Sequence, residues 1–241
     1  MPRWPQNAAG PSPVCALRIV CLDSASAAGD AQSKYLLRSA AEASYDESDG
    51  DDRDGKVRLF AAVVLPDDVL ADLETAVAPY RDDVLAWTLH EQWHITLAFY
   101  GQVADERLPD LKARLTRAAK RYPVVSLALD GAGRFDERTL WVGCSGDVAA
   151  LRDIARSVTA AGRRVGAGSA DDASRFRAHV TLARTRRPVD LRPYVAALDA
   201  YRSRSWTVDS VSLLRSHLGA GTERRSRYEV LSTHPLASQV T

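Results

Sequence analysis

Apolar residues along this chain follow two different periods, which predict two kinds of element. Residues 57–65 are almost continuously apolar, as expected of a buried strand, and apolar positions then recur at helical spacing up to Pro79. Further strands are predicted over residues 85–88, 93–100, 124–129, 139–144, 176–183, 206–215 and 227–232, and further helices over 105–121, 147–162 and 191–201.

Three positions are expected to mark the ends of elements. Gly101 should end the strand 93–100, Asp147 should cap the start of the helix 147–162, and Gly162 should stop that helix. Short strands interleave with helices, and several strands follow one another with no helix between them. This order predicts an α+β fold in which helices pack on mostly antiparallel sheet.

The first 55 residues differ from the rest of the chain. They are rich in Ala, Ser, Pro, Gly and Asp and hold 9 acidic against 5 basic residues, whereas residues 56–241 hold 22 acidic against 27 basic. Such a polar segment cannot bury enough apolar surface to offset the entropy lost on ordering it. We therefore predict a disordered acidic extension over 1–55 and a folded domain over 56–241.

The overall composition is that of a globular protein, with 46% hydrophobic and 26% charged residues. Three cysteines cannot all pair and show no CxxC spacing, which argues against a disulfide framework or a structural zinc site. No apolar stretch approaches the roughly 18 residues of a membrane span, and no signal peptide is recognisable. We expect a monomeric cytoplasmic protein with no membrane contact.

One short motif occurs twice. Residues 94–97 read His-Ile-Thr-Leu and residues 179–182 read His-Val-Thr-Leu, and each motif lies inside a predicted strand. Because side chains alternate between the faces of a strand, the His and Thr of each motif point to one face while the apolar pair anchors the other. Two such matches in a chain with five histidines favour one shared site.

Two histidines and two threonines suit phosphodiester cleavage without a metal ion. One neutral imidazole takes a proton from the attacking water while a protonated one donates to the leaving oxygen, and an unperturbed pKa near 6.5 allows both states. Threonine hydroxyls can donate hydrogen bonds to the non-bridging phosphate oxygens. Residues 163–227 add 14 arginines against 6 acids, which suits a polyanionic ligand or, equally, a solvated surface.

On these motifs the chain resembles the 2H phosphoesterase superfamily, and most closely the bacterial RNA 2′,3′-cyclic phosphodiesterases, also called 2′-5′ RNA ligases. The resemblance implies two pseudo-symmetric lobes of mostly antiparallel sheet with packed helices around a central cleft. It covers about residues 57–236 and is carried by the segments 58–66, 91–101, 176–184, 212–218 and 227–231.

The resemblance also implies roles for individual residues. His94 would be the general acid that protonates the 3′ leaving oxygen, His179 the general base that activates water, and Thr96 and Thr181 the phosphate ligands. The implied substrate is an RNA with a 2′,3′-cyclic phosphate terminus, the product is a 2′-phosphate, and 2′-5′ ligation would use the same chemistry reversibly. No metal or other cofactor is expected. The residues alone do not decide which histidine is the acid.

Arg184 closes the second motif strand and is a further candidate phosphate contact, although strict alternation would put it on the face opposite His179 unless the strand ends or twists there. Three histidines lack a Thr two residues on and are expected at the surface or in the core: His90, His217 and His234. Three aromatic residues could stack on a base but are expected in the core: Trp87, Phe135 and Trp141.

Three other hypotheses remain open. The same site could act on a small cyclic nucleotide such as ADP-ribose 1″,2″-cyclic phosphate. The chain could be an RNA-binding module without turnover, although Arg or Lys would serve phosphate binding better than His and Thr. A metal hydrolase is disfavoured, because no cluster of carboxylates or histidines accompanies the motifs.

Overall fold

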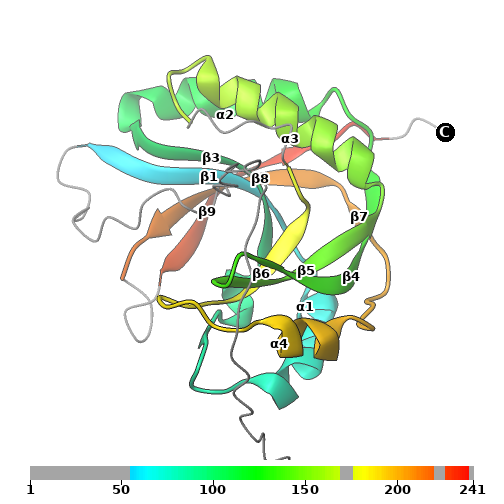
Figure 1. Ribbon diagram of the computed structural model, residues 1–241. Helices are drawn as coiled ribbons and strands as arrows, with labels where there is room; N and C mark the ends of the chain where they lie inside the picture. Colours follow the sequence, from blue (N-terminus) through cyan, green and yellow to red (C-terminus); the bar gives the residue numbers. More distant parts are fainter. Residues whose placement is uncertain (1–54, 169–175, 220–225, 239–241) are drawn as a thin grey trace, which may run out of the picture. The chain divides into compact units, whose positions relative to one another are not determined.

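The computed structural model describes residues 55–168, 176–219 and 226–238, all within one compact unit that spans Ser39–Thr241. The predicted extension over 1–55 therefore lies, except for Gly55, outside the described residues. The described part is α+β, as the sequence predicts: a nine-stranded sheet with four α-helices (Figure 1).

The strands are β1 (Lys56–Val64), β2 (Ala86–Trp87), β3 (His94–Ala104), β4 (Val125–Phe135), β5 (Thr139–Gly146), β6 (His179–Arg184), β7 (Trp206–Val208), β8 (Ser210–His217) and β9 (Arg227–Pro235). The α-helices are α1 (Asp67–Val77), α2 (Leu108–Ala119), α3 (Val148–Arg163) and α4 (Arg192–Leu198), and short 3-10 turns cover η2 (Ala78–Tyr80), η3 (His90–Gln92) and η4 (Asp105–Arg107). Among these described helices, none is both long enough and apolar enough to cross a membrane.

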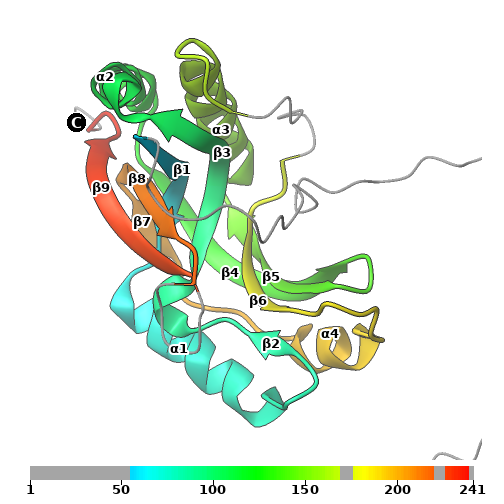
Figure 2. The same ribbon diagram turned by 90° about the vertical axis from the view of Figure 1, so that its left-hand side faces the viewer.

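The strand order across the sheet is β7-β4-β5-β6-β3-β1-β8-β9, with β2 beside β6, and every ladder between strands is antiparallel. Figure 2 shows how strongly the sheet curls between α2 and α3 at one end and α1 and α4 at the other. Because β3 and β6 are adjacent in the middle of the order, they join a half made with β1, β8 and β9 to a half made with β4, β5 and β7.

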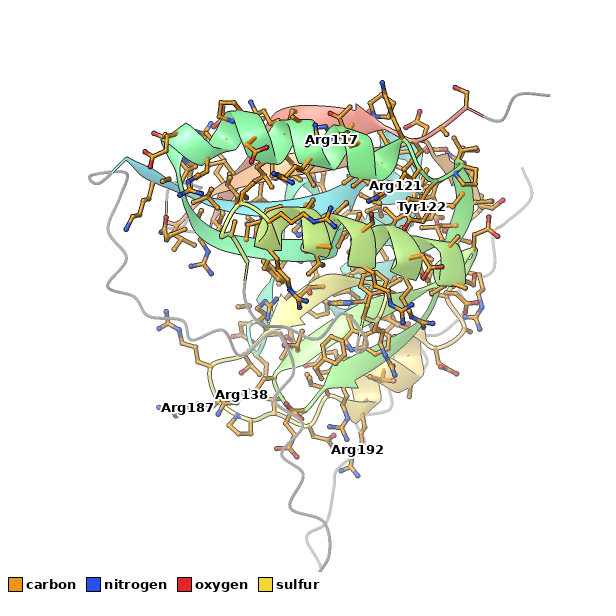
Figure 3. The ribbon with its side chains drawn as sticks, turned by 90° about the horizontal axis from the view of Figure 1, so that it is seen from above. Arg117, Arg121, Tyr122, Arg138, Arg187 and Arg192 are labelled. Atoms are coloured by element: carbon orange, nitrogen blue, oxygen red, sulfur yellow. The ribbon has the colours of Figure 1, made fainter. Side chains whose placement is uncertain are left out.

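Helix α3 packs closely on β3, while α2 and α3 lie side by side in the view of Figure 3. The Tyr100 hydroxyl donates to the Val158 carbonyl at 3.1 Å, and Gly162 lies against the Tyr100 ring. A Cβ at Gly162 would come within 2.5 Å of that ring, so the contact requires a residue without a side chain. α3 ends at Arg163, one residue after the predicted end at Gly162. The glycine at position 162 is explained by the close approach of the Tyr100 ring.

Two further boundary predictions are changed by the structure. Gly101 does not end β3, because its φ of 65° lets the strand pass through a bulge opposite Leu59 and Phe60 and run on to Ala104. Asp147 does stand at the N-cap of α3, but its carboxylate accepts a hydrogen bond from the Ser126 backbone N–H at 2.8 Å. Asp147 thus ties α3 to β4 instead of capping the helix.

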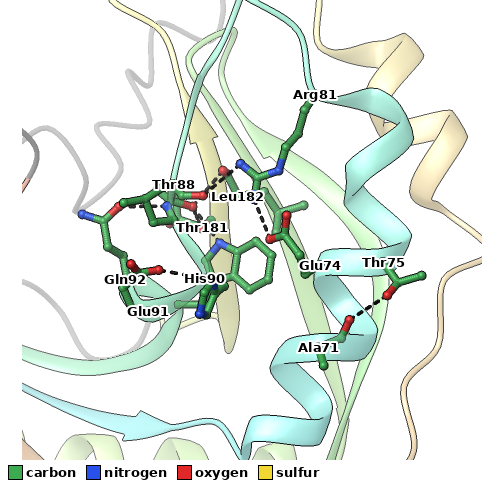
Figure 4. Close-up of polar contacts among 12 residues, drawn as sticks. Ala71, Glu74, Thr75, Arg81, Thr88, His90, Glu91, Gln92, Thr181 and Leu182 are labelled. Carbon is green, nitrogen blue, oxygen red and sulfur yellow. Dashed lines mark hydrogen bonds and ion pairs between the residues drawn. The ribbon is translucent and has the colours of Figure 1, made fainter. Parts of the chain in front are cut away.

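One hydroxyl group ties the segment before β3 to β6. The Thr88 hydroxyl accepts a hydrogen bond from the Trp93 indole N–H at 2.7 Å and faces the carbonyls of Thr181 and Leu182 at 2.9 and 2.8 Å (Figure 4). The Thr88 backbone N–H also donates to the Leu182 carbonyl, at 2.9 Å. Trp93 directly precedes the first motif and Leu182 ends the second, so Thr88 links the two motifs.

Arg81 supports the same segment from the side of α1. Its guanidinium donates to the Thr88 carbonyl at 3.3 Å and to the Glu74 carboxylate of α1 at 2.7 Å. It also lies over the rings of Trp87 and Trp93, at 5.7 and 5.9 Å from their centroids. The segment between β2 and β3 is thereby fixed to α1 on one side and to β6 on the other.

We predict that Thr88→Val lowers the free energy of unfolding by about 1–3 kcal/mol, because Val keeps the shape of Thr but leaves the Trp93 indole N–H without its acceptor. Thr88→Ser, which keeps the hydroxyl, should recover most of this loss. Urea unfolding followed by tryptophan fluorescence measures both variants. Equal stability of the wild type and Thr88→Val would mean that the hydroxyl contributes nothing net.

Candidate active site

The two repeated motifs meet in the middle of the sheet. β3 and β6 pair at one position, Ile95 with Val180, and both of these side chains are fully buried. The residues on either side of this pair point to the opposite face of the sheet. They are the His and Thr of each motif, and all four are half-buried. By this register His94 lies opposite Thr181, and Thr96 lies opposite His179.

Both motif strands carry a bulge at the same place. On β3 the extra residue is Leu97, because its neighbours Thr96 and Ala98 pair with consecutive residues of β1; on β6 the extra residue is Leu182. In each strand the Leu and the Ala after it are both buried, so the alternation of faces shifts by one residue. The residue five positions after each histidine therefore returns to the histidine face.

That residue is Arg184 on β6 and Phe99 on β3. The bulge thus interrupts the strict alternation that would turn Arg184 away from His179. The charge of Arg184 acts on both His94 and His179. Phe99 is 47% exposed, and its ring centroid lies 6.1 Å from that of Phe60. A cation and an exposed aromatic ring occupy equivalent positions in the two halves of the site.

Each histidine ring is held by the same kind of hydrogen bond. Nδ1 of His94 lies 2.7 Å from the carbonyl oxygen of Gln92, and Nδ1 of His179 lies 2.8 Å from that of Arg177. In both cases the carbonyl is two residues earlier in the chain. Because a carbonyl oxygen only accepts, Nδ1 carries the hydrogen, and Nε2 is left to take up or release a proton.

Aromatic rings pack against both histidines, two on each. Their centroids lie 4.8 Å (Phe60) and 5.2 Å (Tyr228) from that of His94, and 4.9 Å (Phe135) and 6.1 Å (Trp141) from that of His179. Sequence reasoning assigned Phe135 and Trp141 to the core and did not select Phe60 or Tyr228. These four rings remove much of the water from around the imidazoles.

Loss of water contact is the main cause that lowers the pKa of His94, to about 4, and the charges of His179 and Arg184 lower it further. The hydrogen bond to the Gln92 carbonyl works in the opposite direction. The pKa of His179 is also lowered, first by burial and then by the charges of Arg184 and Arg177. Both rings are therefore neutral near pH 7 without a ligand, in surroundings that favour an anion.

The remaining histidines make contacts of their own, as expected. They are His90, 3.3 Å from a Glu91 carboxylate oxygen; His217, 2.9 Å from that of Glu229; and His234, buried between the hydroxyls of Thr116 and Ser232. Across residues 55–168, 176–219 and 226–238, no three His, Cys, Asp or Glu side chains gather in a way that could hold a metal ion.

Comparison with known proteins identifies the family of the chain. A family model described as the 2′-5′ RNA ligase superfamily matches residues 65–220. An RNA 2′,3′-cyclic phosphodiesterase of Thermus thermophilus is 32% identical over 180 residues, which cover 67% of this chain and 83% of that protein. A protein of the same name from Geobacillus stearothermophilus is 32% identical over 168 residues, which cover 66% of this chain but only 48% of the longer relative.

Among solved structures, Escherichia coli LigT in its apo form is similar to this chain with a TM-score of 0.59 and 24% identity, over 76% of this chain and 99% of that one. At 24% identity, the similarity to LigT shows a shared fold only. The family match is broader evidence, because it takes in both histidine motifs and more than half of the sequence. The chain belongs to the 2′-5′ RNA ligase superfamily.

Proposed function

We propose that this protein hydrolyses the 2′,3′-cyclic phosphate at the 3′ end of an RNA to a 2′-phosphate. The observation that carries the proposal is the antiparallel meeting of the two motifs, which puts two imidazoles and two threonines on one face of the sheet. The Nδ1 hydrogen bonds support it further, since they leave both Nε2 atoms for proton transfer. The two relatives described above bear the name of this activity.

In the proposed reaction a water oxygen attacks phosphorus and the bond from phosphorus to O3′ breaks. His179 takes the proton of the water at Nε2, and His94 gives the proton on its Nε2 to O3′. This assignment follows the family resemblance, because the pairing of the motifs is nearly symmetric. Thr96, Thr181 and Arg184 would donate hydrogen bonds to the non-bridging oxygens, whose charge changes in the transition state.

Ligation requires only a different nucleophile. When the 5′-hydroxyl of a second RNA takes the place of water, the same proton transfers give a 2′-5′ phosphodiester, and the reverse of that step cleaves it. Neither reaction calls for a metal ion in this scheme, since the imidazoles supply the acid and the base and Arg184 supplies positive charge.

The aromatic surroundings favour a nucleotide as the substrate. Phe99 is exposed on the histidine face, and its neighbour Phe60 contacts both Phe99 and His94. An exposed ring close to a phosphate site offers a surface on which a base can stack, as in many proteins that bind single-stranded RNA. Phe99 would thus hold the base while Arg184 holds the phosphate.

His94→Ala and His179→Ala should each lower kcat by at least about 100-fold, because each removes one partner in proton transfer. The substrate is an oligoribonucleotide ending in a 2′,3′-cyclic phosphate, assayed with EDTA, and the product should be a 2′-phosphate. His90→Ala, an exposed histidine outside the site, serves as the control and should remain active. Loss of wild-type activity in EDTA, or full activity of either site variant, would contradict the proposal.

The pH dependence should differ between kcat and kcat/KM. The phosphodiester brings a negative charge to two rings whose pKa values are low in the free protein, and this charge favours the imidazolium form. Binding therefore raises both pKa values, so both limbs of the kcat profile should lie at higher pH than those of kcat/KM. Both profiles are measured from rates on 2′,3′-cyclic AMP between about pH 4 and 9. Profiles of kcat and kcat/KM whose limbs lie at the same pH would contradict the prediction.

Phe99→Ala should raise KM for 2′,3′-cyclic AMP by roughly 5- to 150-fold, since stacking of one base contributes about 1–3 kcal/mol. Glycerol 1,2-cyclic phosphate has no base, so its KM should change little. Tyr80→Ala, which removes another partly exposed ring, is the matched control. An equal effect of Phe99→Ala on both substrates would exclude a stacking role.

A further inference from the structure

The second motif strand leads directly into an exposed basic tip. β6 ends at Arg184, and the next residue, Thr185, donates its backbone N–H to the carbonyl of Arg138, in the turn between β4 and β5, at 2.9 Å. The Thr185 hydroxyl donates to the carbonyl of Arg187 at 2.7 Å. Arg138 and Arg187 are thus held beside each other on fixed backbone, and Figure 3 shows them together at one end of the view.

The charges of this tip are only partly neutralised. Asp190 is occupied by Arg192, which donates to both of its carboxylate oxygens, and Arg134 donates to the backbone carbonyl of Asp136. Arg138 and Arg187 are exposed, and neither forms an ion pair with any described residue, although the carboxylates of Asp136 and Glu137 belong to the same turn. Two positive side chains therefore face solvent next to the end of β6.

A second group of arginines lies on the outer helices and offers a contrast. A hollow of about 250 Å³ between α2 and α3 is lined by Arg114, Arg117, Arg121, Ser157, Ala161 and Arg164. α3 packs on β3 through Tyr100, whose side chain leaves the strand on the face opposite the histidines. This hollow therefore has no continuity with the site, whereas the tip continues from Arg184.

We propose that the RNA backbone upstream of the cyclic phosphate runs from Arg184 onto a rim formed by Arg138 and Arg187. This inference rests on the proposed function. Arg138 stands three residues before Trp141, the cross-strand partner of Thr181, and so lies roughly 10 Å from Thr181 along the sheet. The rim would therefore meet phosphates upstream of the terminal nucleotide. Exposed guanidiniums bind such phosphates by charge and without regard to sequence.

The double variant Arg138→Gln/Arg187→Gln tests the rim. The measured quantity is the ratio of kcat/KM for an oligoribonucleotide of about ten residues ending in a 2′,3′-cyclic phosphate to kcat/KM for 2′,3′-cyclic AMP. At low salt the ratio should fall roughly two- to thirty-fold, the effect of two lost exposed ion pairs. For the oligonucleotide, the slope of log kcat/KM against log salt concentration should become less negative by about 1.4, which is about 0.7 for each lost phosphate contact.

The matched control is Arg117→Gln/Arg164→Gln, which removes the same two charges from the hollow between α2 and α3. Its ratio and its salt slope should equal those of the wild type. The rim is refuted if the Arg138/Arg187 variant keeps the wild-type ratio and slope, or if the control lowers the ratio equally. A wild type that hydrolyses neither substrate refutes the proposed function instead, so the two failures are distinguishable.

Discussion

The side chains of Ile95 and Val180 are packed away from water at the one position where β3 and β6 pair. Because successive residues of a strand point to opposite faces, this burial decides on which side the His and Thr of each motif lie. A slip of one residue in either strand would turn an imidazole into the core and bring an apolar side chain to the surface. Apolar packing behind the sheet thus sets the geometry of the polar site in front of it.

The motif strands and the α+β class could be predicted because they depend on local periodicity. Residues 94–97 and 179–182 show within themselves which side chains share a face. The face of Arg184 could not be predicted, since it depends on the bulge at Leu182, and a bulge is defined only by the pairing with β5. Phe60 and Tyr228 were missed for a related reason: they reach His94 from β1 and β9, and strand order is not a local property.

Trp141 is an intermediate case. It is buried, as the sequence analysis expected, yet its ring also packs against His179. Its cross-strand partner is Gly133, where a Cβ would come within 2.2 Å of the indole. A glycine inside a strand is a recognised sign of close approach, so the sequence did carry a signal at this position. It did not carry the identity of the approaching ring, which follows only from the register of β4 and β5.

The Thr88 hydroxyl forms hydrogen bonds both with the indole of Trp93, just before β3, and with the carbonyls at the end of the second motif. Many two-lobed enzymes admit their substrates by a hinge rotation that separates the lobes. Here such a rotation would break the Thr88 bonds and part Ile95 from Val180 in the same movement. The spacing of the two imidazoles is therefore set when the chain folds. Under the proposed function, a ligand would have to fit this existing spacing, because the two halves of the sheet could not move apart to adjust it.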